Sequence, residues 1–273
     1  MKSICFPVCL LLLVGGGCAL SAAQTGTARR DAFARSTQMI VVTTSNWGAV
    51  EGRLQRFERA APHDSWRPAG KGIPIVVGSK GLAWGVGVVA DSAPNVRVAA
   101  EPVKREGDGK APAGIFDLGT AFGYAAQPLP GLKLPYLTLT PSIECVDDAG
   151  SKYYNRIVDR LAVAPDWKSS EHMRYTGESY RWGMVVDLNG TVAGRDRSAP
   201  VPGGGSCVFL HIWHSRDQGT AGCTAMAQTD LETLLVWLDP AREPLLVQLP
   251  KPVYQRLARR WKLPELSDAA AAH

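Results

Sequence analysis

The sequence contains no run of lysine or arginine residues, no internal repeat, and no apolar segment beyond its N-terminus long enough to cross a membrane. Its 30 Lys and Arg residues and 25 Asp and Glu residues are spread along the chain and leave a net charge of +5. Because nucleic-acid binding requires a concentrated basic patch, the composition argues against nucleic acid as a partner. It also predicts no transmembrane span in the mature chain, since such a helix needs roughly 20 consecutive apolar residues.

The N-terminal segment has the composition of a secretory signal peptide. Lys2 provides a short basic region, residues 4–17 are apolar, and the small residues 21–23 fit a signal-peptidase cleavage site. We therefore expect residues 1–23 to be removed and the protein to be exported to the periplasm or cell envelope. Two alternatives stay open, an uncleaved anchor and a lipoprotein attached through Cys18, which follows three glycines.

Cleavage would leave three cysteines in the mature chain, Cys145, Cys207 and Cys223. In an oxidising compartment, an odd count indicates one disulfide and one free thiol. Cys223 lies in a glycine-rich loop with a histidine nearby, so we assign the free thiol to it and expect a Cys145–Cys207 disulfide. The alternative is that all three are reduced and that Cys145 and Cys207 are buried as small hydrophobic residues.

Short apolar runs separated by turn residues dominate the chain, and its 28 glycines and 19 prolines argue against a helix bundle. The apolar patterns predict strands at residues 38–44, 52–58, 72–78, 82–89, 184–188, 207–213 and 245–249. Asn189-Gly190 is a strong hairpin signal, with residues 191–192 returning. The expected fold class is therefore mainly β with a few short helices.

Two helices are indicated near the C-terminus. The first starts at a capping box, residues 229–232, carries a stripe of leucines on one face, and ends at Asp239-Pro240. The second covers residues 253–261. The domain organisation that we expect is a flexible leader at residues 24–36, a single domain at residues 37–262, and a disordered tail at residues 263–273.

Residues 209–226 contain the groups that thiol catalysis requires. His211 lies inside an apolar, strand-like run, and Cys223 follows small residues in the sequence Thr220-Ala-Gly-Cys. A free cysteine has a pKa of about 8.5, so an adjacent imidazole raises its reactivity at neutral pH and can later protonate a leaving amine. Gly222 lets the backbone approach a substrate, and the Cys223 N–H with a neighbouring loop amide would hold the oxyanion.

His214 offers a second imidazole, three residues after His211. Residues three apart on a strand point to opposite faces, so we expect only one of them to approach Cys223. We assign the base to His211, because His214 begins a polar loop; the alternative is that His211 is a core histidine without a catalytic role. The same geometry argues against a zinc site formed by both histidines and Cys223, and the chemistry requires no metal or organic cofactor.

The order of a histidine, a loop, [Ser/Thr]-x-Gly-Cys and a polar helix start resembles the catalytic domain of the L,D-transpeptidase (YkuD-type) family. Residues 110–116, Lys-Ala-Pro-Ala-Gly-Ile-Phe, resemble its upstream segment, and the resemblance covers roughly residues 70–250. It implies a β-sandwich-like domain and cysteine-dependent acyl transfer on peptidoglycan stem peptides. It also implies that Cys223 attacks the carbonyl between a diamino acid and a terminal D-alanine, with His211 as base and Gly222 in the acyl-binding turn.

Two positions depart from the pattern of that family. Ala225 stands where the family usually has an arginine, and Ile212 where it favours glycine. The carboxylate of a substrate therefore needs another partner, for which Arg216 in the loop is the candidate.

Three further residues are assigned to substrate binding, Thr220 beside the nucleophile, Lys110 and Tyr154. Lys110 either touches the substrate or caps a turn, and Tyr154 belongs to a polar aromatic segment that either lines a peptide-binding cleft or is a solvated loop. Residues 171–182 form either a lid or a surface loop anchored by aromatic side chains.

Three functions remain open from the sequence. The first is a transpeptidase that joins stem peptides or exchanges their terminal D-amino acid. The second is a hydrolase on the same fold, an L,D-carboxypeptidase or an enzyme that cleaves a link to the wall. The third is a non-catalytic cell-wall-binding module, which the presence of both Cys223 and His211 disfavours.

Overall fold

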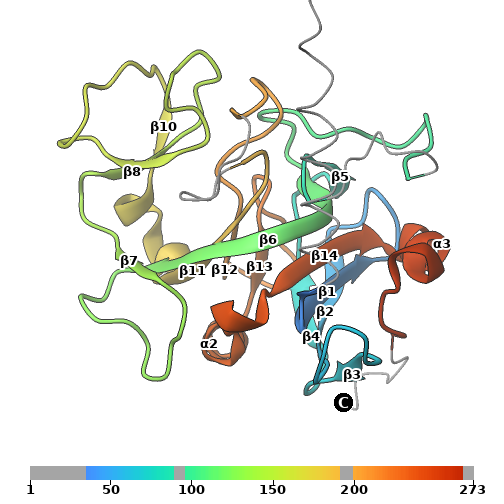
Figure 1. Ribbon diagram of the computed structural model, residues 1–273. Helices are drawn as coiled ribbons and strands as arrows, with labels where there is room; N and C mark the ends of the chain where they lie inside the picture. The colour runs from blue at the N-terminus through green and yellow to red at the C-terminus, as the bar shows by residue number, and fades with distance from the viewer. Residues whose placement is uncertain (1–34, 89–95, 191–198, 267–273) are drawn as a thin grey trace, which may run out of the picture.

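The computed structural model describes residues 35–88, 96–190 and 199–266 of the 273-residue chain (Figure 1). Their strands are β1 (Gln38–Thr44), β2 (Glu51–Glu58), β3 (Arg67–Pro68), β4 (Ile73–Val76), β5 (Leu82–Trp84), β6 (Ala111–Gly123), β7 (Tyr136–Thr138), β8 (Ile143–Val146), β9 (Ile157–Asp159), β10 (Ser170–His172), β11 (Trp182–Val186), β12 (Phe209–Ile212), β13 (Thr224–Met226) and β14 (Leu245–Pro250). The α-helices are α2 (Gln228–Trp237) and α3 (Lys251–Trp261), and three short 3-10 helices are η1 (Met173–Tyr175), η2 (Gly177–Tyr180) and η3 (Pro240–Arg242). The expected mainly-β class with a few helices is confirmed.

The main sheet closes on itself. Within the described ranges, eight strands follow one another in the order β1, β14, β6, β11, β12, β13, β4 and β2, and β2 pairs with β1 again. The architecture is therefore an eight-stranded barrel, and the expected sandwich-like arrangement of sheets is wrong. The apolar pattern of a strand shows that it is buried but does not show which strand pairs with which, so closure could not be inferred from the sequence.

The main hydrophobic core gathers side chains from all round the barrel. Ile40 of β1, Ile115 of β6, Leu210 of β12 and Val247 of β14 belong to it, and each is almost completely buried. The leucines of α2 and the apolar face of α3 join the same cluster. Figure 1 shows α3 near one end of β14, which it follows directly in the chain.

Helix α2 starts differently from the sequence prediction. It begins at Gln228, one residue before Thr229, and its N-cap Ala227 makes no side-chain cap bond. The Glu232 carboxylate, expected to complete a capping box with Thr229, instead accepts a 2.8 Å hydrogen bond from the Gln228 amide. The expected capping box is therefore wrong, and buried leucine packing rather than a cap fixes the helix, as is usual for short helices.

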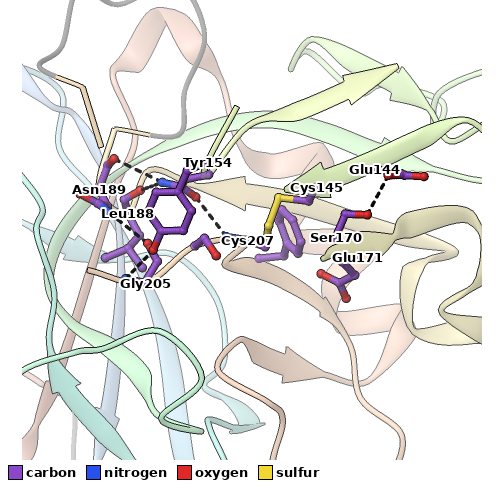
Figure 2. The surroundings of a disulfide bond; sticks show 12 residues. Glu144, Cys145, Tyr154, Ser170, Glu171, Leu188, Asn189, Gly205 and Cys207 are labelled. Carbon is purple, nitrogen blue, oxygen red and sulfur yellow. Dashed lines mark hydrogen bonds between the residues drawn. A yellow bond between two sulfur atoms is a disulfide. The ribbon is translucent and has the colours of Figure 1, made fainter. Parts of the chain in front are cut away.

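A second sheet of three strands, ordered β10-β8-β9, lies beside the barrel (upper left in Figure 1). β10, the last of these three strands in the chain, leads through η1 and η2 back into β11 of the barrel. A disulfide joins Cys145 in β8 to Cys207 in the segment before β12, and Cys223 is the free cysteine of the described chain. This is the pairing expected from assigning the free thiol to Cys223, and the alternative of three reduced cysteines is wrong. Figure 2 shows the bond, with Glu144, Ser170 and Glu171 on one side and Tyr154, Asn189 and Gly205 on the other.

Asn155 forms a second link between this sheet and the barrel. It is fully buried, and its amide donates a 2.8 Å hydrogen bond to the Leu188 carbonyl while its side-chain oxygen accepts a 3.1 Å bond from the Cys207 N–H. Its φ of 59° lies in the left-handed region, which asparagine tolerates better than most residues. The position of Cys207 is therefore fixed by both a covalent and a hydrogen-bonded contact.

The carboxylate of Glu144 organises the three-stranded sheet. It is fully buried and accepts hydrogen bonds from Trp167 (3.0 Å) and Ser170 (2.7 Å), and it pairs with Arg160 (2.9 Å) and His172 (3.0 Å). Burial raises the pKa of Glu144, but the hydrogen bonds from Ser170 and Trp167 and the charge interactions with its ion-pair partners outweigh it and hold the pKa below its usual value.

We expect Glu144→Gln to destabilise the protein by about 2 kcal/mol at pH 7, because charge-assisted hydrogen bonds are lost. A depressed pKa stabilises the folded state above the unfolded pKa of about 4.3 and loses this contribution as the pH falls through the folded pKa. The gap between wild type and variant in urea unfolding should therefore be widest at neutral pH and narrow on acidification. A gap that does not change with pH would contradict this role.

The expected hairpin turn at Asn189-Gly190 is present in part. Asn189 and Gly190 both have positive φ, 55° and 77°, as a tight turn requires. The expected return at residues 191–192 lies outside the described residues, as does the expected signal peptide.

At the C-terminus, Pro264 is buried and its carbonyl accepts a 2.6 Å hydrogen bond from Tyr254, so residues 263–266 pack on the domain instead of belonging to a tail. No helix in the described ranges is long and apolar enough to span a membrane.

Candidate active site

Cys223 and His211 come from neighbouring parallel strands. β12 pairs with β13 so that Leu210 lies beside Thr224 and His211 beside Ala225, which places Cys223 at the level of Phe209. Side chains alternate along a strand, and Leu210 belongs to the main core while Phe209 and Cys223 belong to a second apolar cluster. His211 therefore projects on the same side of the sheet as Cys223, as the assignment of His211 required.

The Cys223 thiol is buried and lies among specific partners. Its sulfur accepts a hydrogen bond from the Phe209 N–H at 3.3 Å, and its S–H donates to the Cys207 carbonyl at 3.6 Å. Burial raises the pKa of the thiol to about 12, and the carboxylate of Glu171 adds to the shift, against smaller opposing effects that include Lys104. In the unliganded protein Cys223 is therefore a neutral thiol.

The imidazole of His211 is held in one tautomer. Its Nδ1 lies 2.8 Å from the Ile212 carbonyl oxygen, and because a carbonyl only accepts, Nδ1 carries the hydrogen. Nε2 is then the unprotonated nitrogen that can take up a proton. Burial lowers the pKa of His211 to about 4, and the bond to Ile212 offsets this only partly. The resting pair is thus thiol and neutral imidazole, without the charges of a thiolate–imidazolium pair.

Both residues line a cavity of about 550 Å³ between the barrel and the segments around the three-stranded sheet. The nucleophile loop contributes Gly219, Thr220, Ala221 and Gly222. His214 lines the same cavity, so the expectation that His211 and His214 face opposite sides is wrong. β12 ends at Ile212, and the alternation of a strand does not extend to residue 214. In the described ranges, no group of three or more His, Cys, Asp or Glu side chains is arranged to hold a metal ion.

The Thr220 hydroxyl shapes the nucleophile loop. It donates a 2.7 Å hydrogen bond to the Cys223 carbonyl and accepts one from the Gly222 N–H at 3.1 Å. The Gly222 amide is therefore engaged within the loop, which leaves the backbone N–H of Cys223 as the better candidate for an oxyanion donor. A Cβ at Gly222 would lie 3.2 Å from the Lys110 carbonyl oxygen, so the loop is also closely packed there.

Thr220→Val should lower the free energy of unfolding by about 1–2 kcal/mol, because two hydrogen bonds of the loop are lost without a change in shape. Thr220→Ser keeps the hydroxyl and should retain a stability close to that of wild type. Thermal unfolding of the two variants measured side by side tests this. Equal losses in both would show that the methyl group, and not the hydroxyl, holds the loop.

The other assigned binding residues lie away from the cavity wall. Lys110 caps a turn, with its Nζ donating to the Lys80 carbonyl at 2.6 Å, and Arg216 is exposed at the tip of the loop. Tyr154 is buried, and its hydroxyl donates to Glu106 at 2.6 Å and accepts from the Gly205 N–H. Its role is therefore to position Glu106, which does line the cavity. The sequence showed these residues as polar or aromatic but not where their side chains point.

Several cavity residues were not assigned from the sequence. They are Lys104, Glu106, Asp147, Glu171 and Tyr180. Glu171 and Tyr180 lie at the two ends of the segment expected to be a lid or a surface loop, and this segment forms one wall of the cavity. Of the described residues that line it, Lys104 is the one lysine or arginine, and it pairs with Asp108 at 2.6 Å. Ala225 is fully buried in β13.

No family model, curated protein or solved structure matches the chain.

Proposed function

We propose that the protein is a cysteine acyltransferase that acts on peptidoglycan stem peptides as an L,D-transpeptidase in the cell envelope. The observation that carries the proposal is that the free thiol of the described residues and an imidazole of fixed tautomer line the wall of one cavity. A purely structural cysteine would not need a cavity of this size beside it, nor a nearby base with its Nε2 available.

The choice of substrate rests on the motif resemblance and on the charges of the cavity. The carboxyl groups of Glu106, Asp147 and Glu171 line it, together with the ammonium group of Lys104. Such a wall suits a peptide that carries both an ammonium and a carboxylate group, as a diamino acid followed by D-alanine does. Glycine-rich turns beside Cys223 leave room for the peptide backbone.

The proposed reaction begins when His211 Nε2 takes the proton of Cys223 and the thiolate attacks the carbonyl before the terminal D-alanine. The Cys223 N–H stabilises the oxyanion, an effect of about 3 kcal/mol for one donor. The imidazolium then protonates the leaving amine, and a thioester remains on the enzyme. An acceptor amine, deprotonated by His211, attacks the thioester and restores the thiol.

The test is mass spectrometry of products formed from disaccharide tetrapeptides by the mature protein, beside Cys223→Ala as control. Cross-linked dimers, or exchange with an added D-amino acid, that depend on Cys223 would support transfer. Loss of D-alanine without dimers or exchange would favour the hydrolase. If wild type and Cys223→Ala both yield no product, the enzymatic proposal fails and a wall-binding module becomes the better account.

A further inference from the structure

Tyr180 lines the same cavity as Glu171 and Cys223, and it packs in one apolar cluster with the Cys223 side chain. Tyr180 is 2% exposed, and its hydroxyl donates a 2.7 Å hydrogen bond to the Glu171 carboxylate. The same hydroxyl interacts with the Cys223 thiol and favours its ionised form. The tyrosine ring is fixed edge-on against Phe209 at 5.5 Å and His211 at 5.4 Å, so it has little freedom to move. The Tyr180 hydroxyl hydrogen is therefore held by Glu171, in the same cluster that contains the Cys223 thiol.

The charged groups around this pair determine which acceptor is preferred. Burial raises the pKa of Glu171, its bond from Tyr180 lowers it, and the nearby Asp147 raises it further. At Cys223, Glu171 raises the pKa, whereas the Phe209 N–H, Lys104 and Tyr180 lower it. His211 is neutral at physiological pH and adds no charge. While Glu171 is ionised, its negative charge and its hold on the hydroxyl both act against the thiolate.

We propose that Glu171 restrains the nucleophile by taking the Tyr180 hydroxyl hydrogen, and that neutralising Glu171 frees this donor for the Cys223 thiolate. Protonation of Glu171, or a cationic group beside it, would neutralise its charge. The thiol proton of Cys223 then passes to His211 or to water, and apart from this proton transfer only hydrogen bonds are exchanged. Glu171 is thus a positioning residue that acts through Tyr180. The role of Glu171 in catalysis rests on the proposed function, but its effect on the ionisation of the Cys223 thiol does not.

The rate of Cys223 alkylation by iodoacetamide, followed by intact mass from pH 4 to 9, tests the proposal without any peptide. The other two cysteines of the described residues are joined in the disulfide, so a protein prepared without residues 1–23 offers the reagent a single thiol. Glu171→Gln should react about tenfold faster at a given pH, the change produced by one pKa unit. Glu178→Gln is the matched control, because Glu178 lies on η2 close to Tyr180 but is exposed and pairs with Arg181. Its rate should equal that of wild type.

Tyr180→Phe separates the hydroxyl from simple charge repulsion. In the Tyr180→Phe background, Glu171→Gln should raise the alkylation rate by clearly less than in the wild-type background. An equal gain in both backgrounds, or no gain in either, would overturn the proposal. If Glu171→Gln does not fold, the wild-type rates still decide. The logarithm of the alkylation rate should rise with pH with a slope below one where Glu171 loses its proton. A slope of one over the whole pH range contradicts the coupling.

Failure of this inference can be distinguished from failure of the proposed function. Faster alkylation in Glu171→Gln with no activity on stem peptides would uphold the control of the thiol and reject the substrate. Activity on stem peptides with unchanged alkylation would uphold the enzyme and reject the role of Glu171.

Discussion

Replacing His211 with glutamine is expected to lower the proposed turnover of stem peptides by about 10² to 10⁴, the usual contribution of a positioned general base. The effect should be large because the Cys223 thiol is neutral and buried, with a pKa raised to about 12, so it depends on a proton acceptor at the moment of attack. Glutamine retains a hydrogen-bond donor for the Ile212 carbonyl. Thermal unfolding close to that of wild type would show that the loss is chemical.

The pH dependence of the wild type provides a second readout of His211. Burial lowers its pKa to about 4, so the base form persists until the pH falls well below the ordinary histidine value of about 6.5. The acid limb of kcat/KM should therefore lie near pH 4. A greater loss of activity in His214→Gln than in His211→Gln would move the base to the exposed histidine of the same cavity.

Removing the disulfide is expected to produce the largest loss of stability. Cys145 and Cys207 are separated by 62 residues, and the entropy of closing a loop of this length corresponds to about 4 kcal/mol. In a domain of this size, that is a fall in Tm of about 10 °C. The double variant Cys145→Ala/Cys207→Ala, measured by calorimetry against wild type, tests this. Activity should fall as well, because the Cys207 carbonyl contacts the nucleophile.

A reducing agent provides the control for this prediction. Reduced wild type should approach the Tm of the double variant, and the double variant itself should be insensitive to reductant. Asn155 also holds Cys207, so part of the geometry should survive. A fall in Tm of less than about 2 °C would mean that the buried contacts of Asn155 and the second apolar cluster already fix the segment without the covalent bond.

The local pattern of the sequence predicted most of what depends on nearest neighbours. The strand predicted at residues 38–44 is β1, Gln38–Thr44. The disulfide is confirmed because the odd count of cysteines, together with the glycine-rich loop around Cys223, indicated which thiol stays free. Pairing between distant strands was not predictable, so the closed sheet was missed. The capping box failed because Gln228 competes for Glu232.

The site was predicted where its residues lie close together in the chain and missed where they do not. Cys223, His211, Gly222 and Thr220 belong to one segment and meet on one cavity wall. Glu171 and Tyr180 are brought to the thiol by a separate sheet, and no spacing in the sequence relates them to Cys223. The residue types of Lys110 and Tyr154 suggested substrate binding, but a sequence does not show in which direction a loop side chain points.

The parallel pairing of β12 and β13 explains why the base and the nucleophile are separated in the chain. Two parallel neighbours cannot be joined by a two-residue turn, because the chain must travel back along the full strand before the second one begins. The connection from Trp213 to Cys223 must therefore run back along the strands, and it exposes Arg216 at its tip. We expect insertions at this exposed tip to be tolerated, whereas the strand register fixes the positions of His211 and Cys223 relative to each other.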